Sequence, residues 1–235
     1  MNLDVLSAAI ALKSKVMDLK PVKSARALHA YATIARDPNQ LGKVFDLRTS
    51  LEDKDKISEI VHGFEANESG RTALRDRFRL GTIDLEALAS LPRGSLGEHF
   101  GTHMIEAKLD PAAIPTLPSD DAGSYVSAHL YETHDIWHVV TGFGTDVAGE
   151  MGLQAFYFAQ FPAFLSAAIL SAALLNTMMF AMDDRDRRME ATARGWDLGK
   201  RAKPLFGANW AARWNEPLED VRSSLAIPRE GVALV

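Results

Sequence analysis

A chain of 235 residues is long enough for one domain of ordinary size with a substantial hydrophobic core. Its net charge of −5 and the lack of a basic block argue against a general nucleic-acid-binding protein. The sequence has no cysteine, so disulfides, thiolate metal sites and cysteine nucleophiles are excluded. Any bound metal must therefore take histidine and carboxylate ligands.

Polar breaks divide the first hundred residues into a series of predicted helices. Apolar residues recur at helical spacing between the breaks, and the Asp-Pro-Asn run at 37–39 is a turn. Ser50 followed by Asp53 indicates one helix start, and Ser95 with Glu98 fits a capping box at another. The helices expected here cover residues 3–19, 25–35, from 53 to 66, 72–78, 84–91 and 96–107.

The N-terminal end carries five basic residues, which are Lys13, Lys15, Lys20, Lys23 and Arg26. A solvated helix face is the simpler interpretation, and contact with anionic lipid headgroups is the alternative. Asp4 lies where a secretory leader would be positive, and no Arg-rich transit segment precedes the helices. We therefore expect a bacterial cytoplasmic protein, peripheral on the inner face of the cytoplasmic membrane.

The centre of the chain places two histidines and a carboxylate within one turn of a predicted helix. Ser119 is expected to cap this long helix, which runs to about Val140. His134 and His138 are four residues apart, so they lie on one face. Asp135 precedes His138 by three residues and falls on the same broad face, about 100° round from His134.

A reversal of the chain is predicted directly after this helix. Glu150 follows His138 by twelve residues and would lie roughly 18 Å further along an unbroken helix. Gly142 and Gly144 favour a helix end, and Asp146 favours the start of the next helix. We therefore expect a metal-binding helical hairpin that returns antiparallel and brings Glu150 beside the two histidines and the aspartate. Two imidazoles and two carboxylates suit zinc, with magnesium or iron as alternatives.

Other interpretations of the histidines differ in the chemistry they imply. The motif is not the HExxH of zinc proteases, because Asp135 replaces the glutamate that acts there as general base. An adjacent His-Asp pair is also typical of metal-dependent phosphohydrolases, which need a further upstream histidine and a distant aspartate. His99 and His103 form a second pair at helical spacing, with Glu98 and Glu106 as neighbouring carboxylates, and we interpret this pair as structural.

The 32 residues from Met151 to Met182 contain no charged residue and no histidine. Pro162 is expected to divide this stretch into two helices. Residues 163–182 are long enough to span a membrane, yet a buried core helix that lines a groove for an isoprenoid tail has the same composition. We favour the core and groove, with a dimer interface as a further alternative. The expected groove walls are Phe156, Phe158, Phe161, Phe164, Met178, Met179 and Phe180.

The remainder of the chain is also predicted to be helical. Gly195 and Gly199 allow a close helix approach, and short final helices are expected to begin at Asn209 and Pro217. No stretch alternates with period two for long enough to indicate a strand. The predicted fold is all-α, a single-domain multi-helix bundle over residues 1–235 with the metal-binding hairpin and an apolar groove.

The spacing HDxxH, eleven residues, then E resembles the metal motif of the ubiquinone biosynthesis family known as the fourth coenzyme-Q protein. The segment LPRGSLG at 91–97 is similar to the LPxGTLG segment of that family, and the run at 35–47 is similar to its N-terminal helix junction. Gln160 with Pro162, and residues 214–227, resemble its C-terminal third. The resemblance covers about residues 25 to 228. Among these segments, the metal motif is the specific one.

This chain departs from the family pattern close to the motif. The family usually has arginines where His129 and Tyr131 stand, and a lysine and a glutamate where Gln154 and Tyr157 stand. The four residues of the metal motif are intact, whereas the charged residues around it are fewer.

The resemblance implies a bacterial enzyme of ubiquinone synthesis that removes the C1 carboxyl group of a polyprenylated hydroxybenzoate, with or without hydroxylation there. The implied metal ligands are His134, Asp135, His138 and Glu150, and Asp135 is the candidate for proton transfer. We expect the substrate to be bound by Tyr131, Phe156, Tyr157, Gln160 and Phe164.

Partners expected from the resemblance are an isoprenoid quinone precursor, other quinone-biosynthesis proteins and a second copy in a homodimer. One alternative function is a non-catalytic scaffold that binds a prenyl lipid and organises these proteins at the membrane. A second alternative is a phosphohydrolase that acts on a prenyl phosphate.

Overall fold

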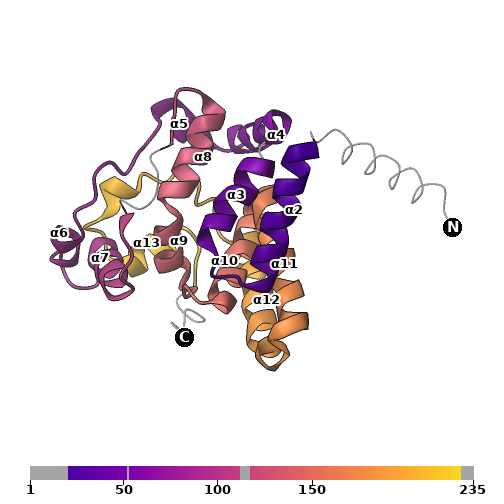
Figure 1. Ribbon diagram of the computed structural model, residues 1–235. Helices are drawn as coiled ribbons and strands as arrows, with labels where there is room; N and C mark the ends of the chain where they lie inside the picture. Colours follow the sequence, from indigo (N-terminus) through magenta and orange to yellow (C-terminus); the bar gives the residue numbers. More distant parts are fainter. Residues whose placement is uncertain (1–20, 52, 112–116, 229–235) are drawn as a thin grey trace.

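A computed structural model describes residues 21–51, 53–111 and 117–228, which form helices and no strand (Figure 1). This confirms the all-α prediction, and the helix predicted over 3–19 lies outside the described residues. The elements in chain order are α2 (Pro21–Arg36), α3 (Leu41–Leu51), α4 (Lys54–Glu65), α5 (Glu68–Asp76), α6 (Leu85–Ala89), α7 (Leu96–Glu106), α8 (Ala122–Glu132), α9 (His134–Thr141), α10 (Val147–Gln160), α11 (Phe164–Phe180), η2 (Met182–Asp184), α12 (Arg185–Arg201), η3 (Trp210–Arg213) and α13 (Leu218–Ser224).

Short polar side chains begin many of these helices by accepting hydrogen bonds from backbone N–H groups in the first turn. Such caps satisfy donors that have no partner within the helix, which is why Ser, Asp and Asn are favoured there. Asp53 and Ser95 cap α4 and α7 as the sequence predicts, and Asn209 and Pro217 precede η3 and α13.

The long helix predicted from Ser119 to Val140 is instead two helices. Asp121 is the N-cap of α8, where its carboxylate accepts hydrogen bonds from the N–H groups of Gly123 and Ser124. The chain breaks at Thr133, whose backbone leaves the helical region and whose hydroxyl donates to the carbonyl of His129. This break begins α9 at His134, so the motif histidines lie on a helix of their own.

Close packing of α10 against α12 depends on glycine. A Cβ atom added to Gly195 would lie 1.9 Å from the carbonyl oxygen of Gly152, so neither helix tolerates a side chain at that crossing. A Cβ atom added to Gly199 would lie 2.7 Å from the carbonyl oxygen of Phe156. The pair of glycines predicted to allow close approach therefore sets the position of α10, which carries Glu150.

The hydrophobic core has two parts. The larger cluster surrounds α9, which packs against α7, α8, α10 and α13 (Figure 1). The smaller cluster joins α2 and α3 to α11. Asn176 ties this second cluster together by donating to the carbonyls of Ala35 and Arg36, and the buried guanidinium of Arg188 donates to its amide oxygen.

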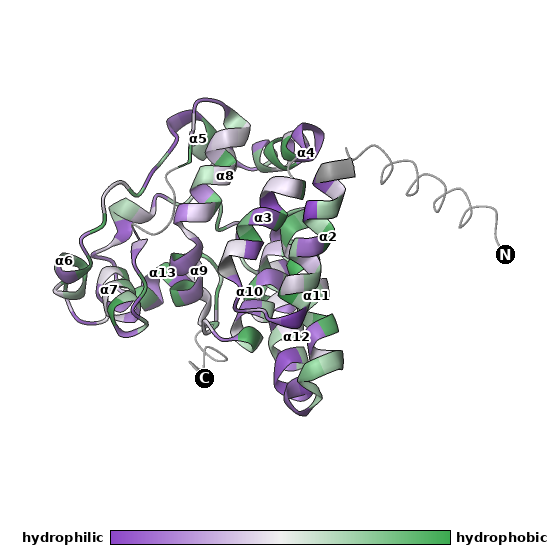
Figure 2. Ribbon diagram, viewed as in Figure 1, coloured by the Kyte–Doolittle hydropathy of each residue, from purple (hydrophilic) through white to green (hydrophobic). Residues whose placement is uncertain are grey.

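The apolar stretch forms two helices separated at Pro162, as predicted. In Figure 2 the hydrophobic colouring continues along α11, whereas α12 is largely hydrophilic. Across the described residues no single helix is long and apolar enough to cross a membrane. The segments 164–180 and 182–201 meet the same length and composition criteria only as a pair bent by 116°.

Large apolar side chains remain exposed where α11 turns into α12. We call this patch the apolar corner, and it consists of Leu174, Leu175, Met178, Met179, Phe180 and Met182. The corner lies at the lower end of the molecule in Figure 1. Single exposed apolar residues are normal on protein surfaces, but a contiguous group indicates a contact surface.

Candidate metal centre

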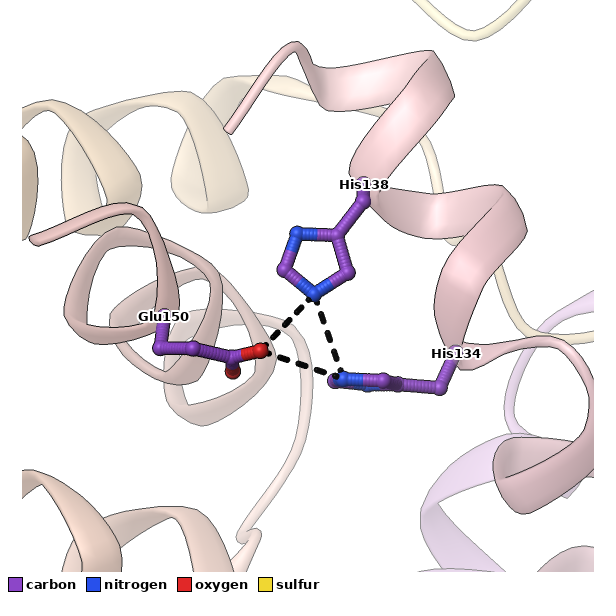
Figure 3. Close-up of side chains that lie close together, drawn as sticks. All are labelled: His134, His138 and Glu150. Atoms are coloured by element: carbon purple, nitrogen blue, oxygen red, sulfur yellow. Dashed lines mark hydrogen bonds and ion pairs between the residues drawn. The ribbon is translucent and has the colours of Figure 1, made fainter. Parts of the chain in front are cut away.

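The side chains of His134, His138 and Glu150 converge on one point, with their ligand atoms within 4.8 Å of one another (Figure 3). The Nε2 atoms of the two histidines are 3.2 Å apart, and Glu150 Oε1 lies 3.1 Å from His138 Nε2 and 3.7 Å from His134 Nε2. The predicted return of Glu150 to both histidines is therefore confirmed.

The turn between α9 and α10 produces this convergence. Gly142 ends α9 in the left-handed conformation, at φ 72°, which glycine adopts without the strain that a Cβ atom would cause. Asp146 begins α10 by accepting a hydrogen bond from Gly149 N–H. In Figure 3, α10 is seen close to end-on while α9 runs across the view, so the helices cross rather than lie antiparallel.

The ring orientation of His138 is fixed from the side opposite the converging atoms. Its Nδ1 lies 3.0 Å from the carbonyl oxygen of Phe143, so Nδ1–H donates there and the lone pair of the neutral ring is on Nε2. The side chain is only 1% exposed. A histidine held in this way offers Nε2 to a metal ion.

His138 and Glu150 each shift the pKa of the other toward its charged form. Burial raises the pKa of the Glu150 carboxyl, but the charge of His138 and hydrogen bonds from both imidazoles outweigh it, so the pKa lies well below its usual range. Burial lowers the pKa of His138, yet the nearby Glu150 carboxylate outweighs burial and the net shift is upward. The site therefore favours a positive charge between the imidazoles and the carboxylate.

The spacing of the donor atoms fits a small divalent ion. Ligand atoms placed about 2.0–2.1 Å from a tetrahedral zinc ion lie roughly 3.3 Å from one another. The three distances between Nε2 and Oε1 atoms, 3.1, 3.2 and 3.7 Å, scatter around that value. Two imidazoles and a carboxylate are also ligands that zinc and related ions accept.

Asp135 is not part of the converging group, contrary to the prediction of four ligands. It lies half-buried in the first turn of α9, next to His134, and its charge contributes to the raised pKa of His138. Neighbouring residues on a helix point in directions about 100° apart, so Asp135 and His134 do not present their side chains in the same direction. Among the residues that the structure describes, the group that could hold a metal ion therefore consists of three side chains.

Of the five residues predicted to bind substrate, Tyr157 lies at the group. Its hydroxyl oxygen is 3.4 Å from His134 Nδ1. Phe156 is fully buried and packs against Trp137. Gln160 uses its amide to hold the end of α12, donating to the carbonyls of Gly199 and Ala202 and accepting from Leu205 N–H.

The other two predicted substrate residues have contacts of their own. Tyr131 lies beside the ring of Phe45 and under the guanidinium of Arg48, and Phe164 lies under the ammonium group of Lys56. A pocket beside the start of α10 has a mixed, partly charged lining of Gly144, Asp146, Ala148, Gly149, Arg187, Glu190, Ala191 and Arg194. The apolar groove for a prenyl tail stays a prediction.

Two residues that lie far from the motif in the sequence are close to α9 in the fold. Arg222 of α13 is nearly buried and donates to the carbonyls of Val139 and Val140, which are free acceptors at the C-terminal end of α9. His103 of α7, interpreted from sequence as structural, has a buried Nε2 without a hydrogen-bond partner among the described residues. Burial, and then the charge of His138, lower the pKa of His103.

Comparison with known proteins places this geometry in a family. Residues 23–230 match the family model described as "Coenzyme Q (ubiquinone) biosynthesis protein Coq4". The chain is 29% identical over 166 residues to the mitochondrial ubiquinone biosynthesis protein COQ4 homolog of Danio rerio, and 31% identical over 155 residues to that of Rattus norvegicus. These matches cover 68% and 65% of this chain and 59% and 58% of the relatives. The chain thus matches about three fifths of their length.

A solved structure has the same fold. The crystal structure of a protein from Nostoc punctiforme assigned to ubiquinone biosynthesis superposes with a TM-score of 0.76 and 27% sequence identity, covering 86% of this chain and 97% of that one. The family match spans most of the chain and includes the converging histidines and glutamate. The chain belongs to the Coq4 family of coenzyme Q (ubiquinone) biosynthesis proteins.

Proposed function

We propose that this protein removes the C1 carboxyl group of a polyprenylated hydroxybenzoate at a divalent metal ion. Zinc is the ion that we favour. Membership of the Coq4 family supports a role in ubiquinone biosynthesis. The group formed by His134, His138 and Glu150 supports the metal ion.

The number of side chains in the group is the observation that favours a catalytic role for the metal ion over a structural one. Structural zinc sites are usually closed by four protein ligands, whereas catalytic sites have three and keep a position for water or substrate. Here three ligands converge and Asp135 lies outside them. A substrate oxygen could therefore occupy the remaining position.

The reaction requires a proton at the carbon that loses the carboxyl group. Breaking the bond to the carboxyl group releases CO2 and leaves the electron pair on the ring carbon, which then takes the proton. When bound, the ion supplies Lewis acidity toward an oxygen of the substrate. His134, His138 and Glu150 would hold the ion, and Asp135, half-buried beside them, would transfer the proton.

Carbon dioxide release from carboxyl-labelled prenylated hydroxybenzoate tests the proposal. We expect the zinc-loaded protein to release labelled CO2, and His134→Ala and Glu150→Gln to lose both zinc and activity while staying folded. The control is His62→Ala, because the His62 side chain is 90% exposed and makes no contact with the group. Release that continues unchanged in both ligand variants would contradict the proposal.

The apolar corner favours a second candidate, a non-catalytic scaffold that binds a prenyl lipid and organises other quinone-biosynthesis proteins at the membrane. In a bacterium this scaffold would be peripheral on the inner face of the cytoplasmic membrane, as a homodimer. Prenyl lipid that co-purifies with a metal-loaded protein incapable of CO2 release would support it. Phosphate release from a prenyl phosphate would instead indicate the phosphohydrolase.

A further inference from the structure

We infer that Tyr157 is a positioning residue that holds the His134 ring with Nε2 directed at the metal ion. The inference rests on the proposed metal site and adds a residue outside the ligand set. It concerns His134 because the two imidazoles are supported differently: a backbone carbonyl orients His138, whereas a side chain contacts His134.

The contact between Tyr157 and His134 is on the side of the imidazole that faces away from Glu150. The tyrosine hydroxyl oxygen is 3.4 Å from His134 Nδ1, while His134 Nε2 is 3.2 Å from His138 Nε2. If Nδ1–H donates to the hydroxyl oxygen, the neutral ring has its lone pair on Nε2. The same arrangement is seen at His138, where Nδ1–H donates to Phe143.

Ring stacking keeps Tyr157 in place. Its ring lies 4.3 Å from that of Trp137, with 6° between the planes, and the His134 ring continues the stack at 6.0 Å and 19°. The tyrosine is 6% exposed, so its hydroxyl has little water to compete for the hydrogen bond. Trp137 and His134 belong to α9, whereas Tyr157 comes from α10.

The helix that carries Tyr157 also carries the carboxylate ligand. Tyr157 follows Glu150 by seven residues, or about two turns, so both residues lie on the same face of α10. This face therefore contributes one ligand directly and orients another. Partners of this kind on metal-bound histidines fix the tautomer and the ring direction, and their loss typically weakens metal binding by about 10- to 100-fold.

Zinc affinity, measured on the full chain by competition with a chromophoric chelator, tests this role without reference to activity. We expect Tyr157→Phe to bind zinc about 10- to 100-fold more weakly than the wild type. The matched control is Tyr131→Phe, which removes the same hydroxyl from a ring that packs at a tilt against Phe45, away from the metal group. It should leave affinity unchanged, and thermal unfolding of both metal-free variants should match the wild type.

If the Tyr157→Phe variant does not fold, a second measurement on the wild type tests the same inference. Nitrogen-15 NMR of the zinc-loaded wild type should show His134 bound through Nε2 with Nδ1 protonated. Metal bound at Nδ1 would overturn the inference, as would a folded Tyr157→Phe variant with wild-type affinity.

The two proposals fail in different ways. If the wild type binds no zinc, or His134→Ala binds it as well as the wild type does, the metal site itself is wrong. If the wild type binds zinc, His134→Ala does not, and Tyr157→Phe binds like the wild type, only the role of Tyr157 is wrong.

Discussion

His129 shows how a buried residue next to the motif can make stability depend on pH. Its side chain is almost completely buried in α8, and Nδ1 is 3.2 Å from the carbonyl oxygen of Phe78. Burial lowers the pKa of His129 to about 4, more than the Phe78 hydrogen bond raises it, and the charge of Arg79 lowers it further. The folded protein therefore keeps this imidazole neutral at pH values where the unfolded chain protonates it.

The expected consequence is a loss of stability as the pH falls from about 6.5 to about 4, because over that range the unfolded state binds a proton that the folded state does not. The pKa difference corresponds to about 3 kcal/mol of unfolding free energy. Urea unfolding between pH 7 and 4.5 measures it. His129→Gln keeps a donor for Phe78 and should show a smaller dependence on pH, and an equal dependence in the two proteins would contradict the assignment.

At the scale of elements, the crossing of α10 and α12 determines where Glu150 lies. We expect Gly195→Ala to lower the unfolding free energy by about 2–3 kcal/mol, because the added methyl group would overlap the backbone of Gly152 and the helices would have to separate. Chemical denaturation measures the change.

A glycine in open space provides the control for that substitution. Gly63 lies within α4, and a Cβ atom there would meet nothing within 4 Å. Gly63→Ala should therefore raise the unfolding free energy by about 0.5–1 kcal/mol, through the lower backbone entropy of alanine in the unfolded chain. If both alanine variants were stabilising, the close approach of the two helices would be disproved.

The same elements show which features the sequence could predict. Local signals were sufficient for Gly142 and Asp146, because a left-handed helix end and an N-cap depend on residue type at a single position. The helix spacing of His134 and His138 likewise predicted that both side chains face the same point. The separate helix α9 was missed, since nothing local marks Thr133 as a break. Arg222 was also missed, because it reaches α9 from 82 residues further along the chain.

For the whole molecule, the apolar corner is the feature that bears most directly on location. Its most exposed member, Phe180, has 62% of its surface accessible. The arginines that follow are paired with acidic neighbours: Arg185 with Asp186, and Arg187 and Arg188 with Asp184. A surface that is apolar and locally neutral suits insertion among lipids by hydrophobic contact rather than by attraction to anionic headgroups.

Vesicle co-sedimentation tests whether the corner contacts membranes. We expect the wild type to bind phosphatidylcholine vesicles and to remain bound at high salt, because no net charge is involved. Replacing both Met179 and Phe180 by Asp should weaken binding by at least about tenfold, since each buried side chain contributes about 1.5–3 kcal/mol. Leu28→Asp is the control, because Leu28 is 69% exposed on α2.

Two other results would assign the corner differently. Binding that requires anionic lipid and disappears with salt would point to the basic N-terminal end, where Lys23 and Arg26 lie. Self-association without vesicles, abolished by the same double substitution, would show that a second copy covers the corner. The effect of salt on vesicle binding therefore distinguishes binding through the apolar corner from binding through a basic surface. The size of the protein in solution shows whether the corner is instead a dimer interface.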